Sequence, residues 1–173
     1  QGTFIGSPSW STFDITTLNV NARGFMGGAF DGRYVYYVPS INDIRFAIVV
    51  RFDTQAKAFA DPQAWSLFTL SSVALDAKGY EGAAFDGRFV YFVPNGGGTS
   101  GLVVRYDTTA PFAEATSWTS YDVGKPDGGP KGFRGAVFDG QYVYFVPMYG
   151  NVVARFHAKS PASMPPGQSG SFL

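Results

Sequence analysis

Cysteine is absent from the 173-residue chain, and histidine occurs only once, at His157. The lack of cysteine excludes disulfides, thiol catalysis and cysteine-ligated zinc. A single histidine leaves little basis for a histidine-rich metal site or a paired-histidine proton relay. The sequence also has no phosphate loop, no glycine-rich turn leading into a helix and no calcium-loop pattern. We therefore expect neither a metal nor a cofactor.

An excess of charge of one sign is also lacking, because 13 Lys and Arg residues balance 13 Asp and Glu residues. A neutral chain has no broad basic surface, so we expect no nucleic-acid partner and no anionic membrane partner. No apolar run approaches the ~18 residues of a membrane span, so no span is expected. The chain opens without a charged-then-apolar leader, and we expect no attached signal peptide. The cellular location stays open, although abundant Ser, Thr and Gly favour a secreted bacterial protein.

Aromatic residues, by contrast, make up 17% of the chain, which also holds 22 glycines and 11 prolines. This composition is typical of many short strands joined by tight turns. The length predicts a single domain, and it is sufficient to bury a sizeable core.

A long motif occurs in three copies, with spacings of 55 and 53 residues. The copies read GGAFDGRYVYYVP, GAAFDGRFVYFVP and GAVFDGQYVYFVP, and they end at Pro39, Pro94 and Pro147. Tryptophans keep the same spacings, at Trp10, Trp65 and Trp118. A phenylalanine precedes each tryptophan by six residues, at Phe4, Phe59 and Phe112. An internal repeat of this length governs the fold prediction.

The second copy shows the strands most clearly. A short strand over 82–85 leads into Asp86-Gly87, a dipeptide typical of tight hairpins. An aromatic and β-branched strand follows over 89–93, and Pro94 ends it. Two more strands are predicted over 102–106 and 118–123. Each copy thus supplies four antiparallel strands, and no segment has the period and caps of a helix.

Four-stranded sheets repeated every 40–50 residues resemble the blades of a β-propeller. The motif is similar to uncharacterised bacterial proteins built from tandem FDGRYVYFVP-type repeats, over residues 4 to 157. The resemblance implies an all-β propeller with three four-stranded antiparallel blades per chain. It implies no particular activity.

The blade boundaries follow from where the repeat begins. Two blades are predicted over 24–70 and 79–123, and the strand 10–15 is predicted to complete the blade of 132–157. This closure by an N-terminal strand is the device that ties a propeller ring shut, and it protects sheet edges. Residues 158–173 are predicted to form an extended C-terminal tail, with Phe172 and Leu173 available to dock.

Three blades are too few for a ring. Propellers usually have four to eight blades, and three would meet at about 120°, too open for face-to-face packing. Two chains would give six blades at about 60°, so we expect a homodimer with C₂ symmetry in which the N-terminal strand crosses to the partner. The alternative is that the sequence is a fragment of a longer multi-blade chain.

Most repeated polar residues have a structural interpretation. The repeated aspartates begin hairpin turns, although they also suggest the paired acids of a glycosidase; they are Asp31, Asp86 and Asp139. The repeated strand arginines are expected to pair with acids such as Asp14 and Asp122, or to form an anion-binding ring; they are Arg51, Arg105 and Arg155. His157 is interpreted as structural. Repeated aromatics are expected to pack between blades.

The binding-site prediction depends on residues near the start of each first strand, which are expected to face one mouth of a central channel. One position differs between copies, as Met26, Glu81 and Arg134, and another stays basic, as Arg23, Lys78 and Lys131. Trp10, Trp65 and Trp118 are candidates either for sheet packing or for an inter-blade pocket. No catalytic set is predicted.

The expected function is a non-catalytic binding or scaffold module that recognises a carbohydrate or another small extracellular ligand. One alternative is a glycoside hydrolase or lyase that uses Glu81 with Asp43 or Asp127. A second alternative is a purely structural assembly unit.

Overall fold

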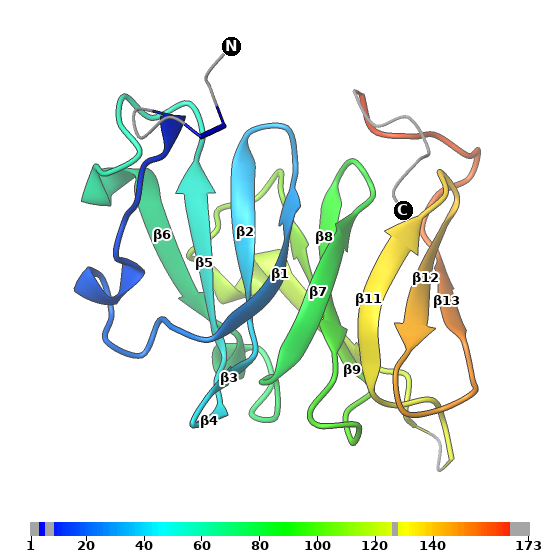
Figure 1. The fold of residues 1–173 in the computed structure, drawn as a ribbon. Helices are drawn as coiled ribbons and strands as arrows, with labels where there is room; N and C mark the ends of the chain where they lie inside the picture. Colours follow the sequence, from blue (N-terminus) through cyan, green and yellow to red (C-terminus); the bar gives the residue numbers. More distant parts are fainter. Residues whose placement is uncertain (1–3, 6–8, 126–127, 167–173) are drawn as a thin grey trace.

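The computed structural model describes residues 4–5, 9–125 and 128–166. Within these residues the chain is all-β: three main antiparallel sheets are present, and the only helices are 3₁₀ turns (Figure 1). The all-β prediction is therefore confirmed. Each sheet is formed by one copy of the sequence motif and the strands that follow it.

Sheet 1 contains β1 (Phe25–Phe30), β2 (Tyr34–Pro39), β5 (Ile48–Asp53) and β6 (Trp65–Thr69), in that order. A small hairpin of β3 (Ile41–Asn42) and β4 (Ile44–Arg45) interrupts the connection between β2 and β5. Sheet 2 contains β7 (Tyr80–Phe85), β8 (Phe89–Pro94), β9 (Leu102–Asp107) and β10 (Trp118–Asp122).

Sheet 3 contains only three strands: β11 (Phe133–Phe138), β12 (Tyr142–Pro147) and β13 (Ala154–His157). No described residue pairs with the outer edge of β13, so this sheet lacks the fourth strand that sheets 1 and 2 have. The first strand of each sheet begins earlier than expected. A β-bulge near its start accommodates extra residues, so that pairing with the second strand continues beyond the bulge. In sheet 2 the bulge lies between Tyr80 and Ala83.

The first strands of the three sheets lie side by side, with β7 between β1 and β11 (Figure 1). Glycines permit this approach. A Cβ atom on Gly27 would lie 2.9 Å from the Cα of Gly82, and one on Gly82 would lie 3.3 Å from the Cα of Gly135. The sheets therefore meet backbone to backbone along their first strands.

Two apolar clusters fill the spaces between the sheets. One lies between sheets 1 and 2 and includes Tyr36, Val38 and Phe92. The other lies between sheets 2 and 3 and includes Val93 and Phe145. Successive residues of a strand point to opposite faces, so sheet 2 is buried on both sides, and its strand β8 is almost continuously apolar.

The N-terminal segment packs on sheet 1 rather than beside sheet 3. The ring of Phe13 stacks on Trp65, with 4.8 Å between centroids, in a third apolar cluster. The predicted strand over 10–15 is not formed within the single chain: residues 10–14 belong to no strand, and Ile15–Thr17 form the 3₁₀ turn η2. A strand needs a free edge beside it, and the free edge of β13 is at the other end of the molecule (Figure 1).

The described part of the C-terminal tail crosses the hairpin between β11 and β12. The amide of Ser163 donates to the carbonyl of Gly140, and Met164 packs against the cluster between sheets 2 and 3. The segment from 158 to 166 has no helix or strand. Phe172 and Leu173 lie outside the described residues.

Candidate functional site

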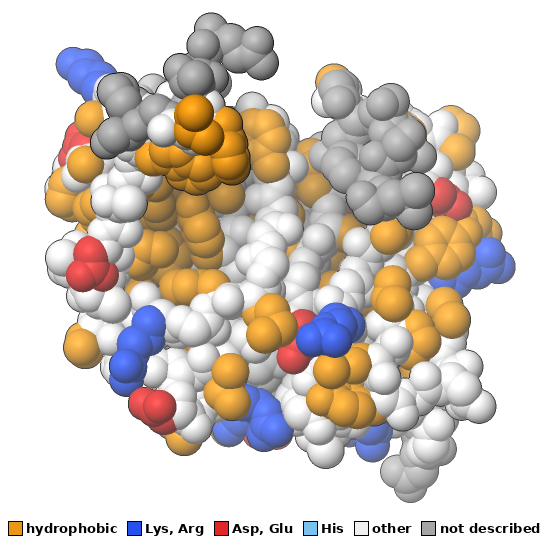
Figure 2. Space-filling model, in the orientation of Figure 1, with side chains coloured by type: hydrophobic (Ala, Val, Ile, Leu, Met, Phe, Trp, Pro, Cys, Tyr) orange, Lys and Arg blue, Asp and Glu red, His pale blue; other side chains and the backbone are white. Residues whose placement is uncertain are grey.

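A polar pocket of about 450 Å³ lies at the lower end of the molecule, where β7 and β11 begin. Its charged lining residues are Arg45, Asp76, Lys78, Asp122, Lys125 and Lys131. Lys and Arg side chains gather along this end in Figure 2. Four basic groups face two acidic ones, so the pocket is locally positive although the chain is neutral.

Two of the predicted site residues, Lys78 and Lys131, meet in this pocket. They precede β7 and β11, and the contact between these strands brings them to one place. Among the described residues, no carboxylate lies within 4.0 Å of either ammonium group, whereas Lys125 lies 3.9 Å from Asp122. Both lysines are therefore available to an anionic ligand.

Sequence reasoning missed Arg45 and Lys125 as pocket residues. Arg45 ends the extra hairpin β3–β4, and its side chain passes Gly79 and approaches Gly97. Any side chain at Gly97 would collide with its guanidinium group. For Arg45, the signal in the sequence was the unequal length of the connections after the second strands, which places unshared residues at this end.

The third predicted basic residue, Arg23, lies in an adjoining cavity of about 550 Å³ that shares Arg45 and Lys78 with the polar pocket. Its guanidinium group donates to Asp43 at 3.1 Å, and both side chains are exposed. Arg23 is thus near the polar pocket but already paired.

The variable position of the three copies lies within the first strands rather than before them. Met26, Glu81 and Arg134 are the second residues of β1, β7 and β11. Arg134 Nε lies 3.6 Å from Glu81 Oε2, and this carboxylate oxygen is buried without a hydrogen bond. The structure therefore brings Glu81 and Arg134 together as an ion pair.

The acids of the hydrolase alternative do not form a catalytic pair in the described chain. Glu81 faces Arg134, Asp43 faces Arg23, and Asp127 lies outside the described residues. The repeated aspartates are occupied in turns: each accepts from the amides two and three residues ahead and from a tyrosine hydroxyl, as Asp86 does from Arg88, Phe89 and Tyr91. Burial and the neighbouring Asp86 raise the pKa of Tyr91, so this hydroxyl stays protonated.

The prediction that the strand arginines pair with acids was wrong. Arg51, Arg105 and Arg155 lie over the rings of Tyr34, Phe89 and Tyr142, with 4.0, 4.3 and 4.2 Å to the centroids. In each sheet, the aromatic ring under the arginine belongs to the first residue of the second strand. A cation–π interaction with the face of this ring holds the arginine in place.

A different arginine forms the repeated ion pair. Arg33 and Arg88, from the turn motif, donate to Asp53 and Asp107 at 2.7 Å. The hydrogen bond from Arg88 lowers the pKa of Asp107 to about 2, and the bond from Arg33 lowers the pKa of Asp53. In the third copy Gln141 and His157 replace the pair, 3.4 Å apart, and His157 stacks on Tyr142. His157 thus has a packing role at this position.

The three tryptophans have unequal environments. Trp65 and Trp118 begin β6 and β10 and are buried among aromatic rings, so they pack the sheets and present no free face to a sugar. Trp10 is 63% exposed.

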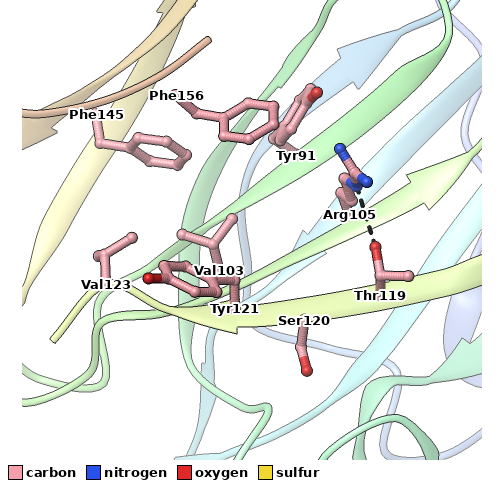
Figure 3. Close-up of a pocket in the computed structure, with 9 residues that line it drawn as sticks. All are labelled: Tyr91, Val103, Arg105, Thr119, Ser120, Tyr121, Val123, Phe145 and Phe156. Carbon is pink, nitrogen blue, oxygen red and sulfur yellow. Dashed lines mark hydrogen bonds between the residues drawn. The ribbon is translucent and has the colours of Figure 1, made fainter. Parts of the chain in front are cut away.

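A second pocket, which is apolar and has a volume of about 480 Å³, opens between sheets 2 and 3 (Figure 3). Its apolar lining residues are Tyr91, Val103, Tyr121, Val123, Phe145 and Phe156. At one end Arg105 donates to the hydroxyl of Thr119 at 3.0 Å. The sequence prediction did not include Tyr121, whose exposed ring lines this pocket, among the candidate binding residues.

No protein-family model matches the chain, and no curated protein matches it. Among residues 4–5, 9–125 and 128–166, no helix is both long and apolar enough to cross a membrane. The same residues contain no group of three or more His, Asp and Glu side chains placed to hold a metal ion.

Proposed function

We propose that the three sheets are blades of a β-propeller and that two chains complete one six-bladed ring, which acts as a non-catalytic binding module. The adjacent first strands support this, since blades of a propeller meet at their innermost strands. The ring forms a scaffold, and the polar pocket at one end is its ligand site.

The open face of sheet 3 supports the completion of the ring by a second chain. Val38 and Val93 are fully buried because the next sheet covers them, but Val146, at the same place in sheet 3, is 47% exposed. Its neighbour Val137 is also exposed. A face of this kind is stabilised by another sheet, and a C₂ partner supplies the matching sheet 1.

The ligand we propose is a carbohydrate that carries a carboxylate. The convergence of Lys78 and Lys131 with Arg45 in one pocket is the observation that carries this proposal. Arginine binds a carboxylate through two parallel hydrogen bonds, and lysines add charge. The glycine-rich loop at Gly96 and Gly101 also lines the pocket and adds backbone groups suited to sugar hydroxyls.

Titration calorimetry with acidic and neutral oligosaccharides tests the ligand proposal. We expect an oligouronate to bind and a neutral oligosaccharide of the same length not to bind. A Lys78→Ala, Lys131→Ala variant should bind about tenfold or more weakly, while Lys57→Ala, an exposed lysine outside the pocket, should bind normally. Equal binding of both oligosaccharides, or of neither, would overturn the proposal.

A further inference from the structure

We infer that the apolar pocket is the seat for Phe4 and Trp10 of a second copy of this chain, which adds residues 10–14 to sheet 3 as its fourth strand. This inference rests on the proposed ring and goes beyond it, because it names the residues that close the ring and their register. It also assigns an occupant to a pocket of about 480 Å³ whose lining is mostly apolar.

The equivalent place between sheets 1 and 2 is filled by a tryptophan. Trp118 stacks on Phe68 with 4.3 Å between centroids and lies 5.7 Å from Phe92 and 4.7 Å from Tyr106. One repeat further along the chain, these three rings correspond to Tyr121, Phe145 and Phe156. All three line the apolar pocket, where the described chain contributes no tryptophan.

Exposure shows the consequence of the missing ring. Phe68 is 7% exposed under Trp118, but Tyr121 is 70% exposed. Tyr106 is 1% exposed, but Phe156 is 42% exposed. The pocket therefore exposes two large rings that the same fold buries one repeat earlier, and a tryptophan is the side chain whose shape those rings accommodate.

The occupant already has the required conformation. Phe4 lies 5.3 Å from Trp10 with an interplanar angle of 70°, and the buried pair of Phe59 and Trp65 has 5.3 Å and 69°. The indole Nε1 of Trp10 donates to the carbonyl of Phe4 at 2.7 Å. Trp65 and Trp118 make the same bond, at 3.0 Å, to Phe59 and Phe112.

The N-terminal segment packs on sheet 1 in the way that the fourth strand of a neighbouring sheet would, although it pairs with no strand in the described chain. Phe13 stacks on Trp65 as Phe68 stacks on Trp118, at 4.8 Å and 4.3 Å, and it occupies the matching position of the repeat. The segment thus covers sheet 1 as the last strand of a preceding sheet would. Its own β13 lies at the opposite end of the molecule, so the sheet that receives this segment belongs to another copy (Figure 1).

The register of the new strand pair follows from the two complete sheets. Phe52 pairs with Trp65 and Arg51 with Ser66, while Tyr106 pairs with Trp118 and Arg105 with Thr119. In the dimer, Phe156 therefore pairs with Trp10 of the second copy. Arg155 pairs with Ser11 of the second copy.

Cysteine cross-linking tests this register directly, since the chain has no cysteine of its own. Residues directly opposite in an antiparallel pair have Cα atoms about 4.5–5.5 Å apart, which suits a disulfide. We expect the Ser11→Cys, Arg155→Cys variant to form linked dimers on mild oxidation. A Thr12→Cys, Arg155→Cys control should not, because residue 12 points to the other face of the strand. Equal linking in both variants, or none, would overturn the inference.

Sedimentation equilibrium of Trp10→Ala provides the second test. Trp10 is exposed in the single chain, so the variant should keep the wild-type circular dichroism spectrum while its dimer dissociates about tenfold or more readily. The control Val20→Ala, at another exposed apolar side chain, should dimerise normally.

The outcomes separate this inference from the proposed function. A dimer that is unchanged by Trp10→Ala would contradict the binding of Phe4 and Trp10 in the apolar pocket, but it would leave the proposed ring intact. A wild-type chain that stays monomeric would contradict both the proposed ring and the binding of a second copy in the apolar pocket. The binding of an oligouronate is measured separately and depends on the polar pocket, so neither result would contradict the ligand proposal.

Discussion

At the scale of single residues, the repeated aspartates stabilise the hairpins of all three sheets through the same set of bonds. Asp31, Asp86 and Asp139 each accept two backbone amides, and their second carboxylate oxygens accept from Tyr36, Tyr91 and Tyr144. Burial differs, because Asp86 is fully enclosed in the middle sheet while Asp139 is not. The same bonds should therefore contribute unequal free energies.

Replacing Asp86 with alanine should lower the free energy of unfolding by about 3 kcal/mol, since it leaves the buried hydroxyl of Tyr91 and two amides without an acceptor. Asp139→Ala should cost about 1 kcal/mol, because water can replace the carboxylate there. Urea unfolding of the two variants measures the difference. Equal losses would contradict the role assigned to burial.

The pair of Arg88 and Asp107 makes stability depend on pH in the acid range. Since the hydrogen bond from Arg88 lowers the pKa of Asp107 from 3.8 to about 2, the folded state binds this proton less readily than the unfolded state. The contribution is present above the unfolded pKa and is lost as pH falls from about 4 to about 2. Urea titrations across this range should show a shallower loss of stability for Arg88→Ala than for the wild type. Identical pH profiles would contradict the pairing.

Among individual residues, the sequence predicted the turn role of Asp86 correctly because the Asp-Gly dipeptide is a local signal. It predicted wrong partners for Arg51, since strand alternation indicates which face a side chain takes but not which ring it meets there. The simultaneous change of Arg88 to Gln141 and of Asp107 to His157 between copies was the available sign of the true pair.

At the scale of strands, glycines control how closely the sheets approach. Gly27 has φ +81° and faces Gly82, and a Cβ there would lie 2.9 Å from the Cα of Gly82. Gly32 has a similar positive φ of +102° but open space around it. These two positions separate the effect of backbone conformation from the effect of packing.

Gly27→Ala should destabilise the fold more than Gly32→Ala. Both substitutions incur the left-handed strain of about 1–2 kcal/mol, and Gly27→Ala adds about 1–3 kcal/mol of overpacking between β1 and β7. Thermal unfolding of both variants measures the gap. A Gly32→Ala variant as unstable as Gly27→Ala would show that the sheets do not pack on these glycines.

The strands of the two complete sheets were largely predictable from the sequence, because hairpin signals and β-branched runs are local. The segment 10–15 was predicted as a strand from its likeness to 65–70 and 118–123. It has the local geometry of those segments, with the same indole hydrogen bond, yet it is not a strand in the single chain. Strand formation depends on a neighbouring edge, which a sequence pattern does not supply.

At the scale of the whole molecule, the exposed face of sheet 3 is the surface on which we propose that the second chain packs. Val146 occupies the position of the repeat that Val38 and Val93 occupy in the other two sheets, where both are fully buried. Val146→Asp should therefore abolish dimers, because dimer formation would bury an unpaired charge. The chain itself should stay folded, since Val146 is exposed in the single chain. Val20→Asp is the matched control, and size-exclusion chromatography of both variants measures the effect. A Val146→Asp variant that dimerises normally would place the interface elsewhere.

The polar pocket was only partly predictable at this scale. Lys78 and Lys131 were selected because they recur before each first strand, and the side-by-side first strands bring them together. Arg45 comes from an insertion whose path no repeat specifies, so only the folded chain places it there. Whole-molecule sites of this kind depend on loop conformation more than on the repeat.

The mass of the wild-type chain in solution tests whether each chain forms half of a six-bladed ring, as we claim. Sedimentation equilibrium over a range of concentrations should give a species of twice the 18.6 kDa of one chain, as six blades in two copies require. A mass of 18.6 kDa at every concentration would contradict the claim.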